Sequence, residues 1–205
     1  MDYNLISFIL TIVGTVLSVL SIAYAIITTK RNKKQEKNTK TIHWAELLTA
    51  SKYISKKLKN DSFIPDIILT PGQKGGIFAQ LIIDDLDLEI PILTGFIIPI
   101  VDTKYRNISL EQYIHLKTTK WHIFLPNVIS NYKDSKILIV DDFVMSGDFL
   151  FTTKNSLDNS GFEMHNIKCS SIVTTKVAIS SNKSPDYFWK IVDSDDCYFP
   201  WGKAK

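Results

Sequence analysis

The sequence predicts an α/β fold, a parallel β-sheet flanked by helices, preceded by one transmembrane helix. Two observations predict it: short apolar runs alternate with stretches of helical periodicity after residue 42, and an uncharged apolar stretch begins the chain. The 205 residues suffice for one domain and an appendage. We therefore divide the chain into a transmembrane anchor (1–29), a basic linker (30–41) and a cytoplasmic domain (42–205).

The expected anchor is residues 5–29, which contain no charged side chain. A helix of this length rises about 37 Å, enough to cross a bilayer. The basic residues that follow predict a single-pass protein of the inner (plasma) membrane, with the N-terminus outside and the larger domain cytoplasmic. A cleaved signal peptide is the alternative, because Ala23-Tyr24-Ala25 resembles a cleavage site. The first four residues carry no positive charge, however, which favours the anchor.

Small side chains form a stripe on one face of this expected helix, at spacings of four and three residues. Such a stripe lets membrane helices approach closely, and we expect a homo-oligomer. The stripe consists of Ser7, Thr11, Gly14, Ser18, Ser21, Ala25 and Thr28.

Charge is concentrated in the linker, where residues 30–40 contain six Lys or Arg and one Glu against a net charge of +3 for the whole chain. The remaining body is nearly neutral, which argues against a nucleic-acid partner. Two cysteines and four scattered histidines show neither a disulfide framework nor metal-ligand spacing. We therefore assign no metal to protein side chains.

The first half of the domain contains two expected helices and two expected strands. Apolar residues recur on one face of a helix over 42–59, which Pro65 follows. Residues 66–69 are an apolar run typical of a buried strand, residues 72–76 form a turn, and residues 77–86 have helical periodicity. The nearly continuous apolar run 90–100 predicts one long buried strand.

The second half begins with residues 101–121, which are polar and lack a clear period, so we expect a long loop or a hairpin. Residues 136–140 predict a buried strand, and residues 147–160 a helix that Gly161 ends. Further strands are expected over 167–176 and 187–193. In parallel sheets of this kind, ligands bind at the carboxyl ends of the strands.

The turn after strand 136–140 is the most informative motif. Asp141 and Asp142 follow the apolar run directly, and Ser146-Gly147 then open a helix. Two adjacent carboxylates do not help packing, and their repulsion calls for a partner such as ribose hydroxyls or a magnesium-bound sugar phosphate. The free N–H groups of the helix start suit a phosphate. An ordinary acidic helix cap is the plainer interpretation.

This stretch resembles the phosphoribosyl pyrophosphate (PRPP) motif of type I phosphoribosyltransferases, closest to the hypoxanthine/guanine/xanthine branch. The likeness extends over residues 42–202. It implies that Asp141 and Asp142 hold the ribose hydroxyls and stabilise the transition state, with Mg²⁺ bound alongside PRPP. The same resemblance implies that three further groups of residues bind the 5′-phosphate, the pyrophosphate and the base. These are Met145, Ser146 and Gly147 for the 5′-phosphate, Lys74, Gly75 and Gly76 for pyrophosphate, and Lys176, Tyr198 and Phe199 for the base.

Some positions depart from the family pattern. Met145 stands where purine enzymes carry an acid that can manage a proton of the base, and Phe149 replaces a closing threonine of the phosphate loop. Asp148 places a negative charge beside the expected phosphate. Two functions therefore stay open: a phosphoribosyltransferase acting on a purine-like base, or a nucleotide or PRPP sensor or effector without turnover, for example in bacterial antiviral defence.

Overall fold

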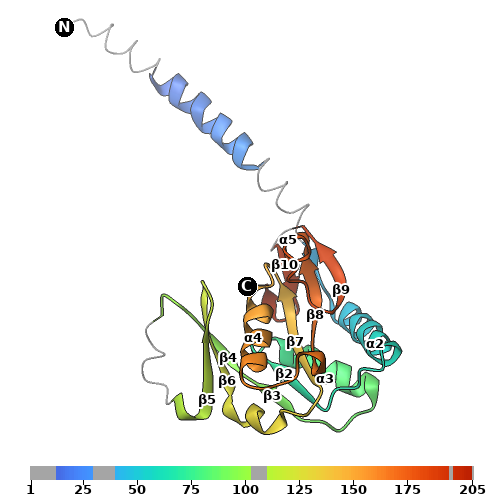
Figure 1. Cartoon of the computed structure of the whole chain (residues 1–205). Helices are drawn as coiled ribbons and strands as arrows, with labels where there is room; N and C mark the ends of the chain where they lie inside the picture. The colour runs from blue at the N-terminus through green and yellow to red at the C-terminus, as the bar shows by residue number, and fades with distance from the viewer. Residues whose placement is uncertain (1–12, 30–39, 103–109, 194–195, 205) are drawn as a thin grey trace, which may run out of the picture. The chain divides into compact units, whose positions relative to one another are not determined.

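The computed structural model describes residues 13–29, 40–102, 110–193 and 196–204 (Figure 1). The chain divides into two units, Met1–Lys40 and Thr41–Lys205. The predicted limits of the linker (30–41) and of the larger domain (42–205) stay predictions. The linker residues 30–39 lie outside the described residues.

In the first unit the structure describes a helix over residues 13–29. Across the described ranges, no helix combines the length and the apolar character needed to cross a membrane. This finding contradicts the predicted transmembrane anchor, and with it the single-pass protein of the plasma membrane with its N-terminus outside and its larger domain cytoplasmic. Residues 1–12, which include the start of the predicted anchor, lie outside the described residues.

Hydroxyl side chains of the small-residue stripe bond within this helix. The Ser18 hydroxyl donates to the Gly14 carbonyl at 2.8 Å, and the Ser21 hydroxyl donates to the Ser18 carbonyl at 2.8 Å. These hydroxyls are therefore satisfied by the preceding turn of their own helix. The homo-oligomer predicted from the stripe stays a prediction.

The second unit is built on a five-stranded sheet with the order β3–β2–β7–β8–β9, in which every neighbouring pair is parallel. The predicted parallel sheet is thereby confirmed. The strands are β2 (Ile67–Thr70), β3 (Ile92–Thr94), β7 (Ile137–Val144), β8 (Ile167–Thr175) and β9 (Tyr187–Val192). The central strands β2, β7 and β8 are almost fully buried, as expected for strands covered on both faces.

Helices cover both faces of this sheet (Figure 1). Side chains of α2 (Trp44–Asn60) and α3 (Gly75–Leu86) join one apolar cluster with Leu138 and Val140 of β7. Side chains of α4 (Asp148–Asn159) join the other cluster with Ile137 and Ile139 of the same strand. Alternate residues of β7 thus face opposite layers, which explains why its apolar run is uninterrupted.

The predicted strand over 90–100 is wrong, because it is two strands in two sheets. β3 belongs to the parallel sheet, whereas β4 (Phe96–Pro99) pairs with β6 (Trp121–Pro126) in an antiparallel sheet of order β4–β6–β5. Gly95 separates them at a close approach, since a Cβ there would lie 2.5 Å from the Phe124 carbonyl oxygen.

The segment 101–121, expected to form a long loop or a hairpin, ends in a hairpin. Its second half forms β5 (Tyr113–Lys117), which pairs with β6. Residues 103–109 lie outside the described residues. A ring stack supports this small sheet: Phe124 lies parallel to Phe96 and to His115, with ring centroids 4.8 and 4.7 Å apart.

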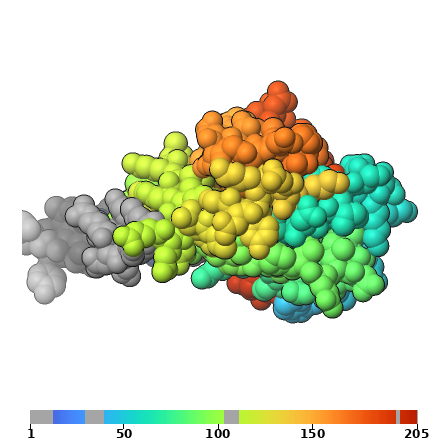
Figure 2. Space-filling view, turned by 60° about the horizontal axis from the view of Figure 1, so that its bottom comes forward, coloured from blue at the N-terminus to red at the C-terminus, as the bar shows by residue number. Residues whose placement is uncertain are grey.

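Short elements complete the unit. The 3-10 helix η3 (Asn127–Tyr132), yellow in Figure 2, lies between α4 in orange and the residues of α2 in cyan. At the carboxyl end of the sheet, α5 (Lys176–Ser180) follows β8, and a small sheet has the order β1–β10–β11. Its strands are β1 (Lys40–Thr41), β10 (Cys197–Phe199) and β11 (Gly202–Lys203), and the remaining 3-10 turns are η2 (Leu110–Gln112) and η4 (Met164–Asn166).

Two neighbouring glycines at the start of α3 provide a test of this packing. A Cβ at Gly75 would lie 2.4 Å from the Val140 carbonyl oxygen, whereas the nearest atom to one at Gly76 is 3.9 Å away. We expect Gly75→Ala to destabilise the protein by about 1–3 kcal/mol, because backbone must shift. Gly76→Ala should stabilise it by about 0.5–1 kcal/mol. Urea denaturation of both variants measures the difference, and equal effects would contradict the packing.

Candidate functional site

The predicted acid pair lies at the carboxyl end of β7, in the centre of the parallel sheet. Asp141 pairs in register with Ser171 of β8, so both acids still belong to the strand. Asp142 is buried at 5% exposure, and Asp141 is partly exposed. The backbone N–H of Asp142 donates to Asp141 Oδ1 at 3.0 Å, which fixes the first carboxylate against its own strand.

Burial dominates the electrostatics of the pair. It raises the pKa of Asp141 well above its usual range, and the neighbouring charge of Asp142 raises it further. Burial also raises the pKa of Asp142, although the hydrogen bond from Trp201 and the charge of Lys74 oppose that rise. The carboxylates therefore carry a desolvation cost in the folded protein that a cation or a set of hydroxyl donors would reduce.

Trp201 supplies the side-chain donor that reaches Asp142. Its indole Nε1 donates to Asp142 Oδ2 at 2.8 Å. The indole stacks on Phe199 with ring centroids 5.3 Å apart and meets Trp44 edge-on at 6.2 Å. The sequence analysis did not assign Trp201 to the site. Phe199 and Trp201, the aromatic residues on either side of Pro200, were the signal in the sequence. They did not indicate that Trp201 would bind Asp142 of β7.

The glycine-rich turn after β2 packs against the acid pair. A Cβ at Gly75 would lie 3.2 Å from the Cα of Asp141 as well as close to Val140, so only glycine allows this approach. Lys74 precedes the helix, and its Nζ donates to the Lys203 carbonyl oxygen in β11 at 2.8 Å. The structure thus brings the predicted pyrophosphate loop and the predicted ribose-binding acids together. The segment 197–204 supplies partners to both.

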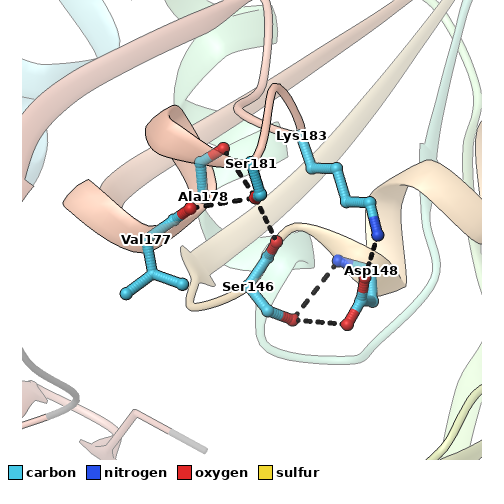
Figure 3. Close-up of polar contacts among 6 residues, drawn as sticks. All are labelled: Ser146, Asp148, Val177, Ala178, Ser181 and Lys183. Carbon is cyan, nitrogen blue, oxygen red and sulfur yellow. Dashed lines mark hydrogen bonds and ion pairs between the residues drawn. The ribbon is translucent and has the colours of Figure 1, made fainter.

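The predicted phosphate loop, Met145 to Gly147, connects β7 to α4. Gly147 has φ +80°, a left-handed conformation that favours glycine. Hydroxyls from the neighbouring strand and helix fix the loop: Thr175 donates to the Met145 carbonyl oxygen, and Ser181 donates to the Ser146 carbonyl oxygen at 3.4 Å (Figure 3). These bonds hold the loop at the edge of the sheet where a ligand would bind.

Asp148, one of the residues that depart from the family pattern, is paired rather than isolated. Lys183 Nζ lies 2.6 Å from its Oδ1, and the Ser146 hydroxyl donates to its Oδ2 at 3.0 Å (Figure 3). These two hydrogen bonds lower the pKa of Asp148. Lys183 was not predicted for the site, and its separation of 35 residues from Asp148 left no local signal in the sequence.

The predicted base-binding residues are spread over the carboxyl edge. Lys176 starts α5 and pairs with Asp193 at 2.7 Å, both side chains being largely exposed. Tyr198 is 40% exposed, and Phe199 is buried under Trp201. An open pocket of about 460 Å³ lies beside Phe199, but its lining does not include the acid pair or Lys176. A base-binding role for these residues stays a prediction.

The part of the chain that the structure describes has no group of three or more His, Cys, Asp or Glu side chains able to hold a metal ion. Asp141 and Asp142 can supply carboxylate oxygens to a cation that a ligand brings with it. Oxygen donors of this kind suit Mg²⁺, which is usually held by one or two carboxylates together with phosphates.

The parallel sheet thus carries an acid pair at the end of its central strand, with a glycine-rich turn packed against that pair and a helix start beyond it. The sequence model of the phosphoribosyl transferase domain matches residues 40–203. The chain therefore belongs to the phosphoribosyltransferase family, of type I, as the sequence motifs predicted.

Solved structures share the fold at low sequence identity. A purine phosphoribosyltransferase from Pyrococcus horikoshii matches with TM-score 0.59 and 19% identity over 81% of this chain and 95% of its own. A Helicobacter pylori xanthine-guanine-hypoxanthine phosphoribosyltransferase matches with TM-score 0.56 and 18% identity over 79% and 94%. A hypothetical protein from Neisseria gonorrhoeae with bound ppGpp matches with TM-score 0.56 and 15% identity over 80% and 89%. No curated protein matches the sequence.

Replacing the first acid tests the cost of burying it. The pKa of Asp141 is higher in the folded than in the unfolded protein, so stability falls as pH rises from about 4 through the folded pKa. We expect Asp141→Asn to be more stable than wild type at pH 7.5, on the order of 1 kcal/mol or about 2–4 °C in Tm, and to lose that advantage near pH 4. The Asn oxygen can still accept from the Asp142 N–H.

Thermal denaturation of both proteins across this pH range measures the effect. His115 has a lowered pKa, caused by burial and by the charges of His122 and Lys117, so it reduces stability in acid. That contribution is common to both proteins and cancels in the difference. A variant less stable than wild type at every pH would contradict the expectation.

The Trp201 hydrogen bond is tested with Trp201→Phe, which keeps an aromatic ring against Phe199 and removes the N–H donor. We expect a loss of about 1.5–3 kcal/mol, the usual value of a hydrogen bond to a charged group, and a further rise in the pKa of Asp142. Urea denaturation and a carboxyl NMR titration measure the two effects. Trp44→Phe is the matched control, because the 58% exposed Trp44 meets Trp201 only edge-on. Equal changes in both variants would show that the bond to Asp142 is not responsible.

Proposed function

We propose that this protein binds PRPP with Mg²⁺ and transfers the phosphoribosyl group to a purine-like base with release of pyrophosphate. The observation that carries the proposal is the close packing of the Lys74–Gly76 turn on the acid pair. Because Gly75 lies against Val140 and Asp141, the start of α3 and the positive charge of Lys74 stand beside the acid pair. Such a combination suits a ligand that joins a pyrophosphate to a ribose.

The chain's residues would divide the ligand between them. Asp141 and Asp142 accept from the ribose 2- and 3-hydroxyls, the Lys74 turn holds the pyrophosphate, and the loop Met145–Gly147 with α4 holds the 5′-phosphate. Asp141 and Asp142 could supply carboxylate oxygens to a Mg²⁺ ion that arrives with PRPP, and the ion would supply positive charge that favours departure of the pyrophosphate. Asp141 is partly exposed and therefore accessible to these contacts, whereas Asp142 is held in place by the Trp201 hydrogen bond to its Oδ2.

In the proposed reaction, the bond from C1′ to the pyrophosphate oxygen breaks, and a bond from C1′ to a ring nitrogen of the base forms. Pyrophosphate leaves with the bonding electron pair, and the proton of the base nitrogen passes to water, because Met145 stands where a proton-accepting acid would be. Positive charge develops on the ribose ring in between. The two carboxylates are placed to stabilise that charge.

A second candidate function is binding of a nucleotide or PRPP without turnover. It is favoured by Met145, which cannot accept a proton, and by the Ser146 hydroxyl, which is bonded to Asp148. Lys176 and Asp193 bind each other at the position proposed for the base. Turnover distinguishes the two functions, because both predict saturable binding of PRPP.

Isothermal titration of the full-length protein with PRPP and Mg²⁺ tests the proposal. We expect saturable binding, with affinity reduced at least about tenfold in Asp142→Asn, because a charged hydrogen-bond acceptor is lost. Asp158→Asn, an exposed acid of α4, is the matched control and should bind as wild type does. Pyrophosphate release with a panel of purine bases then separates transferase from sensor. Absence of PRPP binding, or equal binding by Asp142→Asn, would overturn the proposal.

A further inference from the structure

The carboxylate of Asp148 occupies the donors that a phosphate at this site would need. One oxygen accepts from the Ser146 hydroxyl at 3.0 Å, and the other from Lys183 Nζ at 2.6 Å (Figure 3). A hydroxyl, an ammonium group and the free N–H groups of a helix start are the donor types that bind phosphate monoesters. In the described structure the Ser146 hydroxyl and the Lys183 ammonium group bind an internal anion, the Asp148 carboxylate.

The position of Lys183 is fixed by backbone packing against the phosphate loop. A Cβ at Gly147 would lie 2.0 Å from the Lys183 carbonyl oxygen and 2.5 Å from its Cβ, so the two segments are in direct contact. The Lys183 N–H donates to the Ala178 carbonyl at 2.9 Å. The Ser181 hydroxyl joins α5 to the Ser146 carbonyl. These contacts place Lys183 beside the loop Met145–Gly147.

The ion pair can nevertheless be exchanged. The side chains of Lys183 and Asp148 are 34% and 44% exposed, so solvent screens their attraction and either can rotate away. A phosphate dianion placed beside Asp148 would be repelled by it. A phosphate that displaces the Asp148 carboxylate would accept hydrogen bonds from Lys183 and Ser146. The repulsion between the phosphate and Asp148 would then be smaller, because the carboxylate lies farther away.

We propose that Lys183 is a phosphate-binding residue of this site and that Asp148 is an internal competitor for it. The affinity for a phosphate monoester then depends on how readily the phosphate replaces the Asp148 carboxylate on Lys183 and Ser146. This inference rests on the proposed function, since it assigns Lys183 to the 5′-phosphate end of the same ligand. It makes Asp148 a residue that determines how strongly the site prefers phosphorylated over unphosphorylated ribose compounds.

Titration of the full-length protein with ribose 5-phosphate, and with PRPP and Mg²⁺, tests the inference. Lys183→Met should weaken ribose 5-phosphate binding about tenfold, and Asp148→Asn should strengthen it about three- to tenfold. In the Asp148→Asn background, Lys183→Met should cost more than in wild type, because the lysine is then free for phosphate. Lys168→Met removes an ion pair of similar exposure, with Asp186, and should leave binding unchanged.

The outcomes separate this inference from the proposed function. If the wild type binds and Asp142→Asn weakens binding, but Lys183→Met and Asp148→Asn change nothing, the inference alone is overturned. Weaker binding by Asp148→Asn also overturns it. If no variant binds ribose 5-phosphate or PRPP, both fail. Should Lys183→Met not fold, as judged by circular dichroism, Asp148→Asn decides alone, because only competition predicts tighter binding.

Discussion

The burial of two adjacent carboxylates at the end of β7 is the constraint on which the site depends. Asp142 is 5% exposed, and burial raises the pKa of both acids. A buried acid pair is unfavourable without partners, and the described chain supplies the Trp201 indole to Asp142 Oδ2 and the Asp142 backbone N–H to Asp141 Oδ1. The hairpin β10–β11 is held over the sheet by the Trp201 bond and by Lys74. The same C-terminal segment is also anchored in the apolar core, where Cys197, Phe199 and Ala204 are buried.

The fold could be predicted from the sequence where local patterns decide it. The apolar run of β7 and the two acids behind it identified the central strand and the ligand edge, because adjacent acids there have no use in packing. The run 90–100 was predicted as one strand because its apolar residues are nearly continuous. The break at Gly95 depends on the close approach of the Phe124 carbonyl, which is a tertiary contact. The apolar stretch 5–29 likewise predicted a membrane span, whereas the helix described covers 13–29.

The candidate site was predictable as far as its motifs are contiguous. Asp141, Asp142, Ser146 and Gly147 lie in one segment, and Lys74 with Gly75 in another. Their packing on each other follows from parallel order, because carboxyl ends of neighbouring strands share an edge. Contacts across distant segments were not predictable. Trp201 and Asp142 are 59 residues apart in the sequence. Their hydrogen bond depends on tertiary packing, which the local sequence pattern does not indicate.

The three groups proposed to bind the ligand each have an internal substitute. Trp201 donates to Asp142, the Lys203 carbonyl accepts from Lys74, and Asp148 accepts from Ser146. Two of these substitutes, the Lys203 carbonyl and the Asp148 carboxylate, carry less charge than the pyrophosphate or phosphate whose place they take. Ligand binding is then an exchange of polar partners rather than the filling of an empty site. The net free energy of binding is the difference between the contacts made to the ligand and those made to the internal partners. Changes in the internal partners would therefore alter the affinity without changing the residues that contact the ligand.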